Sequence, residues 1–174
     1  YRSLLFAHRN YGGTPETDVS EEVAGRIETA VAAFEEAVAT YDIRLIGQIG
    51  VELANFGNEY IQRHEPWNLV DDDPSKAATV IRDCVQLTKA IAVLLQPVMP
   101  ETAERLWGQL GETEPVAAVD LGTATAAPPV EFGEPDELFA QDEDDEVVDL
   151  NEVLHRRIEW TTEASRDAEA TESD

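Results

Sequence analysis

Residues 73–98, DPSKAATVIRDCVQLTKAIAVLLQPV, constrain the fold more than any other stretch of this chain. Asp73 suits the N-cap of a helix and Pro74 its first position, where the N–H that proline lacks is not needed. Apolar residues then recur at helical spacing and make a stripe wide enough to be buried on two sides. The stripe consists of Ala77, Val80, Ile81, Cys84, Leu87, Thr88, Ile91, Leu94, Leu95 and Val98. Gln96-Pro97 bends or ends this helix.

The apolar spacing and the capping residues on either side predict further helices. They cover residues 1–11, about 20–40, about 43–64 and 100–110. Ser20 can cap the second of them, while Gly12-Gly13 and Gly111 can end the first and the last. No stretch among these residues predicts a convincing strand. The expected fold is therefore all-α, an antiparallel helical bundle of about five elements.

Composition divides the chain into three parts. Residues 1–111 form the expected bundle, and the proline-rich residues 112–146 predict an extended arm that packs on it. The candidate apolar anchors of this arm are Val130, Phe132, Leu138 and Phe139. Residues 147–174 predict an acidic C-terminal helix and a frayed tail. Because Tyr1 falls in the middle of an expected helix, we expect the chain to be part of a longer protein.

The acidic charge is extreme and extends over the whole chain. The formal net charge is -25, from 37 acidic and 12 basic residues, and residues 131–174 hold only 17 of the acids. Apolar types make up 43% of the residues, which excludes a disordered acidic chain. Lysine is scarce, with only Lys76 and Lys89 present. A folded, acidic, lysine-poor protein is typical of salt-loving cytoplasms, where screening lowers the cost of self-repulsion.

Several classes of function are disfavoured by what the sequence lacks. Cys84 is the one cysteine and lies on the apolar stripe, which predicts a buried thiol rather than a disulfide, a nucleophile or a zinc site. The acidic run QDEDDEVVD, residues 141–149, lacks the glycine turn of a calcium loop and predicts a solvated stretch. No phosphate-binding loop, membrane span or signal peptide is visible. We therefore expect a cytoplasmic chain with no metal, cofactor or membrane partner.

Polar and aromatic residues gather at two helix ends. Arg9 and Asn10 close the first helix, and the stretch NEYIQRHEPWNL, residues 58–69, places Trp67 just past the end of the third. If these two helices run in parallel, as antiparallel packing of consecutive helices allows, their ends can lie side by side. A rigid exposed ring near a guanidinium is suited to binding a flat base. The simpler structural interpretation is that Trp67 folds back as a hydrophobic lid and Arg9 pairs with a carboxylate.

Four segments resemble, in this order, the C-terminal anticodon-binding domain of archaeal methionyl-tRNA synthetase. They are AHRNYGGTPE (7–16), ELANFGNEYIQRHEPWNL (52–69), LLQPVMPETAERLWGQLG (94–111) and FGEPDELFAQDEDDE (132–146). The LLxPxMPxTAExLW element looks like one shared with the class I synthetases for leucine, isoleucine and valine. The NxYIxxxxPW pattern, the arginine of RNYGG and the GxPxxLF pattern point to methionine. The resemblance covers most of residues 1–146.

The resemblance implies particular RNA contacts. In that family an arginine near the end of the first helix and the tryptophan of the PW pair contact the CAU anticodon of methionine tRNA. Arg9 and Trp67 are the matching positions, and His8, Asn10 and Asn58 are further candidates for RNA contacts. Some bacterial members also use an asparagine four residues before the arginine. This chain has a leucine at that position, residue 5, so that contact is not carried over.

The resemblance also implies where the chemistry takes place. In the family, an upstream domain of the same chain activates methionine with ATP and transfers it to the tRNA for protein biosynthesis. No HIGH-like or KMSKS-like motif occurs in these 174 residues. We therefore expect this segment to be catalytically silent, with methionine tRNA and the upstream catalytic domain as its partners.

Two other classes of function stay open at this point. An acidic helical protein-interaction module without RNA binding would use Trp67, Trp107 and Trp160 as partner anchors. A small helical enzyme would place a carboxylate metal site at residues 142–149. A Trp67→Ala variant that loses only a protein partner would favour the first, and calorimetry with magnesium, manganese and calcium would reveal the second.

Overall fold

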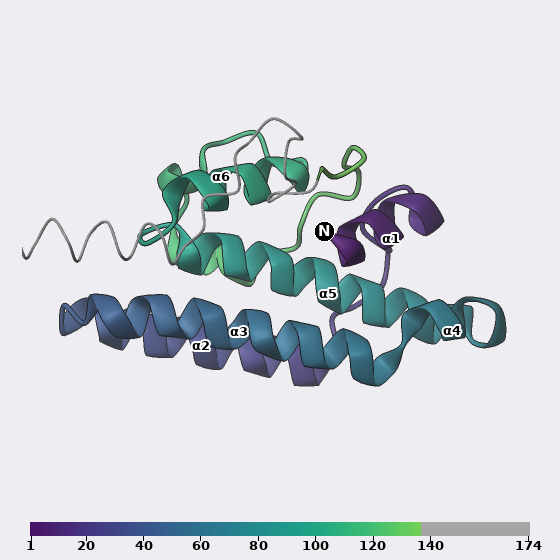
Figure 1. Cartoon of the computed structure of the whole chain (residues 1–174), viewed down its shortest axis with the longest axis horizontal. Helices are drawn as coiled ribbons and strands as arrows, with labels where there is room; N and C mark the ends of the chain where they lie inside the picture. Colours follow the sequence, from purple (N-terminus) through teal and green to yellow (C-terminus); the bar gives the residue numbers. More distant parts are fainter. Residues whose placement is uncertain (137–174) are drawn as a thin grey trace, which may run out of the picture. The chain divides into compact units, whose positions relative to one another are not determined.

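The computed structural model describes residues 1–136, and these residues are mainly helical (Figure 1). The elements are α1 (Arg2–Tyr11), α2 (Glu21–Ala39), α3 (Ile43–His64), α4 (Pro66–Asp72), α5 (Pro74–Leu95), α6 (Pro100–Gln109) and the 3-10 helices η1 (Val116–Ala118) and η2 (Leu121–Ala124). Within this part of the chain the β-structure is an isolated antiparallel bridge between Gly13 and Glu131. The predicted all-α fold is thus confirmed.

The helix α5 is the centre of the described bundle. It packs against α3 on one side, and α1 and α6 pack against it on the other, while α2 pairs with α3 (Figure 1). Its residues from Val80 to Leu87 are all buried, which confirms the burial on two sides predicted from residues 73–98. Cys84, with 5% of its surface exposed, is the buried thiol that its place on the stripe predicts.

Caps at the helix ends form where the sequence predicts them. The Ser20 side chain accepts a hydrogen bond from the N–H of Val23 at the start of α2. Asp73 does the same for Lys76 at the start of α5. Gly12 ends α1 in the left-handed conformation, with φ 74°, which glycine adopts without the steric cost of a Cβ. These local interactions fix the element boundaries independently of the tertiary packing.

One helix, α4, occupies residues that lie between the helices predicted from the sequence. Glu65 adopts a left-handed conformation, with φ 42°, and separates the end of α3 from the start of α4. Pro66 then takes the first helical position, where its fixed backbone angle is favourable. A seven-residue helix is too short for apolar periodicity to become visible, and this explains the difference.

The close approach of α3 and α5 depends on Gly50. A Cβ at this position would lie 2.4 Å from Cδ2 of Leu95, a distance that real Cβ atoms do not reach. At Gly47 and Gly57, by contrast, a Cβ would meet its neighbours at 3.9 and 3.7 Å, which is ordinary contact. Of these three glycines, Gly50 is therefore the one that the close approach of α5 requires.

The arm, defined here as residues 112–136, is held on α5 by two buried polar side chains. The Gln86 amide donates hydrogen bonds to the carbonyl oxygens of Ala124 and Ala126, both at 3.0 Å. The Lys89 ammonium lies 2.6 Å from a carboxylate oxygen of Glu112. These groups tolerate burial because each has a partner. The apolar stripe gives no sign of them, since their partners come from distant residues.

The expected apolar anchors of the arm behave differently from one another. Phe132 is buried, as predicted, with 6% of its surface exposed. Val130 is 56% exposed, and it is its backbone carbonyl that contacts the bundle, accepting a hydrogen bond from the N–H of Thr14 at 2.8 Å. The prediction of a Val130 side-chain anchor is therefore wrong. Leu138, Phe139 and the predicted helix in residues 147–174 lie outside the described residues.

Candidate nucleic-acid interface

Trp67 stands in the first turn of α4, where a rigid backbone presents its ring to solvent. Glu65 in its left-handed conformation donates its N–H to the carbonyl of Ile61, and so closes α3 immediately before the turn. Pro66 is buried, while Trp67 is 49% exposed. The interpretation of Trp67 as a buried lid therefore does not match this structure. About half of the surface of this residue is therefore open to solvent.

A buried network supports the end of α3 that carries Trp67. Tyr60 is 3% exposed, and its hydroxyl donates to the carboxylate of Asp83, which is fully buried. The other carboxylate oxygen accepts from the backbone N–H of Ser20 at 2.8 Å. Burial, and then the Asp83 carboxylate, raise the pKa of the Tyr60 hydroxyl, so it remains a donor. This network joins α3, α5 and the start of α2.

The last turn of α3 is packed by aromatic and basic side chains. The ring centroids of Tyr60 and His64 are 4.2 Å apart, and Nδ1 of His64 forms a hydrogen bond of 2.9 Å with the carbonyl of Tyr60. The Arg63 guanidinium lies 5.6 Å from the centroid of the Tyr60 ring and pairs with Glu22 of α2. The contacts of His64 and of Arg63 limit the motion of this turn, which precedes Trp67, because they engage its polar side chains.

Arg9 lies in the last turn of α1 with its side chain 65% exposed. Its Nη2 atom is 3.5 Å from a carboxylate oxygen of Glu134 in the arm. The pairing of Arg9 with a carboxylate, which the simpler structural interpretation proposes, is thus present, and Glu134 is the partner that sequence reasoning did not single out. Nothing near Arg9 in the sequence identifies this partner, since 125 positions separate the two residues.

The three further candidates differ in their availability. Asn58 is exposed on α3. Asn10 is exposed too, and its amide donates to the carbonyl of Phe6 at 2.9 Å. His8 is half-buried, with Nδ1 in a hydrogen bond of 3.1 Å with the carbonyl of Phe132. His8 therefore fixes the arm to α1, and its second ring nitrogen is the one left for another contact.

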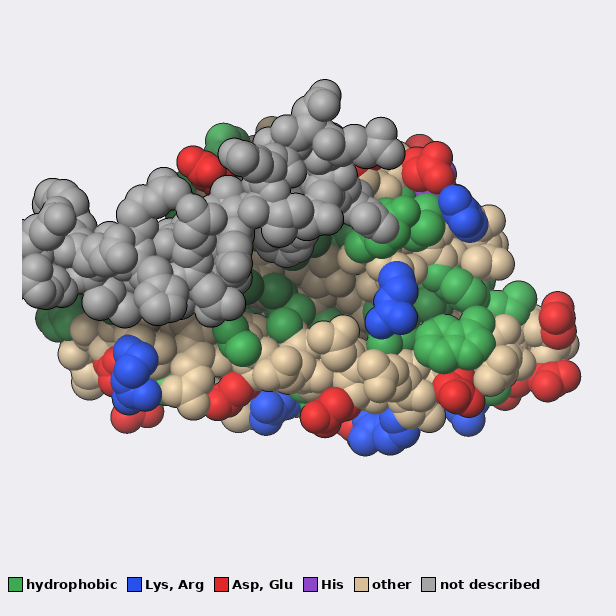
Figure 2. Space-filling view, viewed as in Figure 1, with side chains coloured by type: hydrophobic (Ala, Val, Ile, Leu, Met, Phe, Trp, Pro, Cys, Tyr) green, Lys and Arg blue, Asp and Glu red, His purple; other side chains and the backbone are tan. Residues whose placement is uncertain are grey.

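The two helix ends are organised around α5 rather than directly against each other. The sequence allows the ends of the first and third helices to lie side by side if the two helices run in parallel, and in the structure α1 packs on α5 while α4 leads into α5 (Figure 1). In this view α4 and the C-terminal end of α1 lie toward the same end of the bundle (Figure 1). Hydrophobic side chains are exposed there, with acidic and basic side chains around them (Figure 2). Arg9 belongs to the last turn of α1, and Trp67 belongs to the first turn of α4.

Two negative findings limit the chemistry of residues 1–136. No group of three or more histidine, cysteine, aspartate or glutamate side chains in this range is arranged to hold a metal ion. None of the helices in the same range is long and apolar enough to cross a membrane. The carboxylate run at 142–149, where the alternative of a small helical enzyme would place a metal site, lies outside the described residues.

Comparison with known families identifies the fold that carries these residues. A family model described as the anticodon binding domain of methionyl tRNA ligase matches residues 11–157 of the chain. The chain belongs to this family. The match includes Trp67, while Arg9 lies two residues before it begins.

Relatives of this methionyl-tRNA ligase domain come from halophilic archaea. The methionine–tRNA ligase of Haloarcula marismortui is 68% identical over 154 residues, which cover 88% of this chain and 22% of that protein. The methionine–tRNA ligase of Halobacterium salinarum is 51% identical over 170 residues, covering 97% of this chain and 24% of that protein. The chain thus spans about a quarter or less of the length of these relatives.

Solved structures of methionyl-tRNA synthetases share the fold of this family member. The Mycobacterium tuberculosis enzyme with bound methionyl-adenylate matches with a TM-score of 0.63 and 22% identity, over 79% of this chain and 29% of that one. The free form of that enzyme gives a TM-score of 0.64 over 83% of this chain and 31% of that one. These structures support the fold, and the family model together with the archaeal relatives confirms the resemblance to archaeal methionyl-tRNA synthetase predicted from the four sequence segments.

The exposure of the tryptophans limits the anchors that the interaction-module alternative could use. Trp107 is 1% exposed, and its indole N–H donates to the carbonyl of Glu114 at 2.8 Å. It belongs to the core, so its predicted role as a partner anchor is wrong. Trp160 lies outside the described residues. Trp67 is thus the tryptophan of the anticodon-binding bundle that has an exposed ring in residues 1–136.

Proposed function

We propose that this domain recognises the CAU anticodon of methionine tRNA, with Trp67 as a stacking platform and Arg9 as a hydrogen-bond donor. Membership of the family supports binding of tRNA. The observation that carries the residue-level proposal is the 49% exposure of Trp67, on a backbone held by Pro66 and by the Tyr60–Asp83 network. Because the platform is rigid before RNA arrives, little conformational entropy is lost on binding.

The chemistry of single-stranded RNA recognition matches these two side chains. Bases splayed out of a loop stack on aromatic faces and are distinguished by hydrogen bonds to their edges. The stacking of one base contributes about 1 to 3 kcal/mol, which corresponds to roughly 5- to 150-fold in affinity. A guanidinium supplies five N–H donors in a planar fork and needs no proton transfer to act. Trp67 and Arg9 together supply one platform and one set of donors.

Because the net charge is -25, binding of RNA requires a high salt concentration. A polyanionic protein repels RNA, and the usual gain from phosphate contacts is absent. At about 1 M salt the Debye length falls to about 3 Å, from about 10 Å at 0.1 M, so distant carboxylates no longer act on the RNA while stacking contacts do. We therefore expect binding to be less weakened by KCl than that of a basic RNA-binding protein.

We further propose that the complete protein is a cytoplasmic methionine–tRNA ligase whose catalytic domain lies elsewhere in its chain. Supporting this, the relatives that this chain matches are named methionine–tRNA ligases and are about four times longer. ATP and methionine would be used by that catalytic domain, and the 174-residue segment would be inactive in methionine-dependent ATP–pyrophosphate exchange. Activity in that assay by the segment alone would overturn this part of the proposal.

The function is tested by comparing anticodons with the 174-residue chain in molar KCl. Filter binding would measure the dissociation constants of a CAU stem-loop and of three stem-loops with one base changed. The proposal predicts at least a fivefold preference for CAU at 1 and 2 M KCl. Equal affinity for all four stem-loops would contradict it, and so would a loss of several decades of CAU affinity between 0.1 and 1 M KCl.

A further inference from the structure

The arm is fastened to the C-terminal end of α1 just before Glu134. The backbone N–H of Thr14 donates to the carbonyl of Val130 at 2.8 Å, and the Thr14 hydroxyl donates to the carbonyl of Pro129 at 2.6 Å. Gly13 bridges to Glu131 at the same place, where a Cβ would lie 2.1 Å from the Val130 carbonyl oxygen. The two backbones can therefore approach this closely because residue 13 is a glycine.

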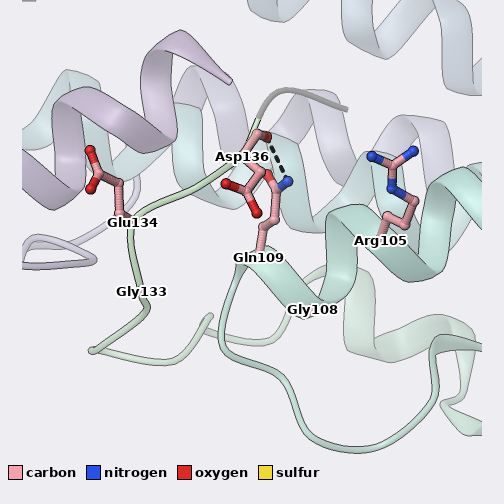
Figure 3. Close-up of a pocket in the computed structure, with 6 residues that line it drawn as sticks. All are labelled: Arg105, Gly108, Gln109, Gly133, Glu134 and Asp136. Atoms are coloured by element: carbon pink, nitrogen blue, oxygen red, sulfur yellow. Dashed lines mark hydrogen bonds between the residues drawn. The ribbon is translucent and has the colours of Figure 1, made fainter. Parts of the chain in front are cut away.

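A second attachment of the arm lies two residues after Glu134. The Gln109 amide of α6 donates to the carbonyl of Asp136 at 2.7 Å (Figure 3). On the other side, the carbonyl of Phe132 is held by His8. Glu134 therefore lies midway between two fixed points of the arm, each two residues away. Its place beside α1 is set by the arm and does not depend on its own contact with Arg9.

A surface pocket at this attachment is lined by Arg105 as well as by Glu134, and these two side chains do not form an ion pair. Glu134, Asp136, Gln109 and Arg105 all line a surface pocket of about 340 Å³. Gln109 lies between Glu134 and Arg105, and the Glu134 side chain points away from the Arg105 guanidinium (Figure 3). In the described part of the chain the ion pair of Glu134 is with Arg9. Of the two arginines, it is therefore Arg9 whose guanidinium the Glu134 carboxylate pairs with.

The Arg9–Glu134 pair has the properties of a contact that a ligand can displace. Its N–O distance is 3.5 Å, and the two side chains are 65% and 64% exposed. Exposed pairs of this kind are weak, because water screens the charges and two long side chains must be held in one geometry. The pair nevertheless occupies Nη2, one of the donor groups that a base would need.

We propose that Glu134 competes with the anticodon for the Arg9 guanidinium and so makes anticodon binding depend on salt. The inference rests on the proposed function, in which Arg9 donates to anticodon bases. At low salt the Glu134 carboxylate pairs with Arg9 and repels nearby phosphates. The binding of any RNA is then weakened by the free energy needed to separate the ion pair. At high salt both effects are screened, and Arg9 becomes available to an anticodon whose edges match it. Glu134 therefore adjusts recognition to a concentrated salt solution.

The test compares Glu134→Gln with the unchanged 174-residue chain, using the CAU stem-loop at 0.2 and 2 M KCl. Glutamine keeps the size of the side chain and removes its charge. We expect the variant to bind CAU about twofold to fivefold more tightly at 0.2 M KCl, the range that an exposed ion pair can supply, and within twofold of the parent at 2 M. Glu131→Gln is the matched control, because Glu131 is exposed on the same arm and its carboxylate pairs with no described residue.

A second arm of the experiment isolates the coupling to Arg9. In an Arg9→Gln background, Glu134→Gln is expected to give no gain at either salt concentration, whereas in an Arg105→Gln background the gain is retained. The melting temperature should stay the same in Glu134→Gln, since the arm is held by other contacts. A gain that persists in Arg9→Gln, or an equal gain in Glu131→Gln, would overturn the inference by showing a general electrostatic effect.

Failure of this inference and failure of the proposed function give different results. If the parent chain prefers CAU in 2 M KCl and Glu134→Gln changes nothing at 0.2 M, Glu134 does not compete for Arg9, while the proposed function stands. If the parent shows no preference for CAU at any salt concentration, anticodon recognition itself is refuted, and the role of Glu134 with it.

Discussion

The hydroxyl of Tyr60 donates a hydrogen bond to the fully buried carboxylate of Asp83, and this one contact connects the end of α3 to the centre of α5. Tyr60 lies seven residues before Trp67, so the same contact fixes the helix end that presents the indole. A buried acceptor that loses its donor keeps the full cost of desolvation. The orientation of the proposed RNA platform thus depends on a polar group within the core.

Replacing Tyr60 by phenylalanine removes this donor while keeping the ring. We expect Tyr60→Phe to lower the free energy of unfolding by about 1 to 3 kcal/mol, because Asp83 is left with the Ser20 N–H alone. Urea unfolding in 2 M KCl measures the change. Tyr41→Phe, at a tyrosine that is 89% exposed, is the control and should shift stability by less than about 0.5 kcal/mol. Equal effects of the two substitutions would remove the structural role assigned to the network.

Replacing either of two helical glycines by alanine should change the stability of the fold, and the two changes should have opposite signs. At Gly50 a Cβ would lie 2.4 Å from Leu95, so Gly50→Ala should destabilise the fold by about 1 to 3 kcal/mol through overpacking. At Gly25, in the exposed face of α2, a Cβ would meet nothing within 4 Å. Gly25→Ala should therefore stabilise by up to about 1 kcal/mol through helix propensity. Thermal unfolding of both variants checks the pair, and a stabilised Gly50→Ala would contradict the described packing of α3 on α5.

The buried thiol of Cys84 predicts a loss of stability in alkali. Burial, and then the adjacent Asp83 carboxylate, raise the pKa of Cys84 to about 12 from an ordinary value of 9.0. Between these two values the unfolded chain releases the thiol proton and the folded chain keeps it, so stability falls as the pH rises. The slope from this thiol is at most about 1.4 kcal/mol per pH unit. Urea unfolding from pH 8 to 11 should show a shallower slope in Cys84→Ala than in the parent, and identical slopes would place the thiol in contact with water.

The elements with local signals could be predicted from the sequence, and the contacts between distant residues could not. Ser20, Asp73 and Gly12 act within a few positions of themselves, so their caps are visible in the sequence. The polar groups of α5 are different. Arg82, Gln86 and Lys89 are spaced by four and three residues and therefore share one helical face. The apolar stripe of the same helix makes this polar face hard to recognise in the sequence.

The candidate site was predictable to a similar extent. The position of Arg9 at a helix end and of Trp67 beside Pro66 is present in the sequence, whereas the sequence leaves open whether Trp67 is exposed or folds back as a lid, and the structure shows it exposed. Their arrangement around α5 depends on tertiary packing, and the pairing of Arg9 with Glu134 depends on a turn of the arm more than a hundred residues away. No periodicity or spacing encodes such a contact.

The acidic surface predicts that salt stabilises the fold. The net charge of -25 makes the folded state repel itself, and added salt screens this repulsion. We expect the melting temperature of the 174-residue chain to rise by at least several degrees between 0.1 and 3 M KCl. Differential scanning fluorimetry measures it directly. A chain that is fully folded in dilute buffer but unfolds or precipitates in molar KCl would refute the halophilic interpretation.

The most direct test of anticodon recognition is the dissociation constant of the CAU stem-loop for Trp67→Ala in 2 M KCl. Stacking on the exposed indole predicts a loss of roughly 5- to 150-fold relative to the parent chain, at an unchanged melting temperature. Tyr41→Ala removes an exposed aromatic ring at the opposite end of α3 and should leave the affinity within twofold. If Trp67→Ala binds the CAU stem-loop as tightly as Tyr41→Ala does, this indole does not read tRNA.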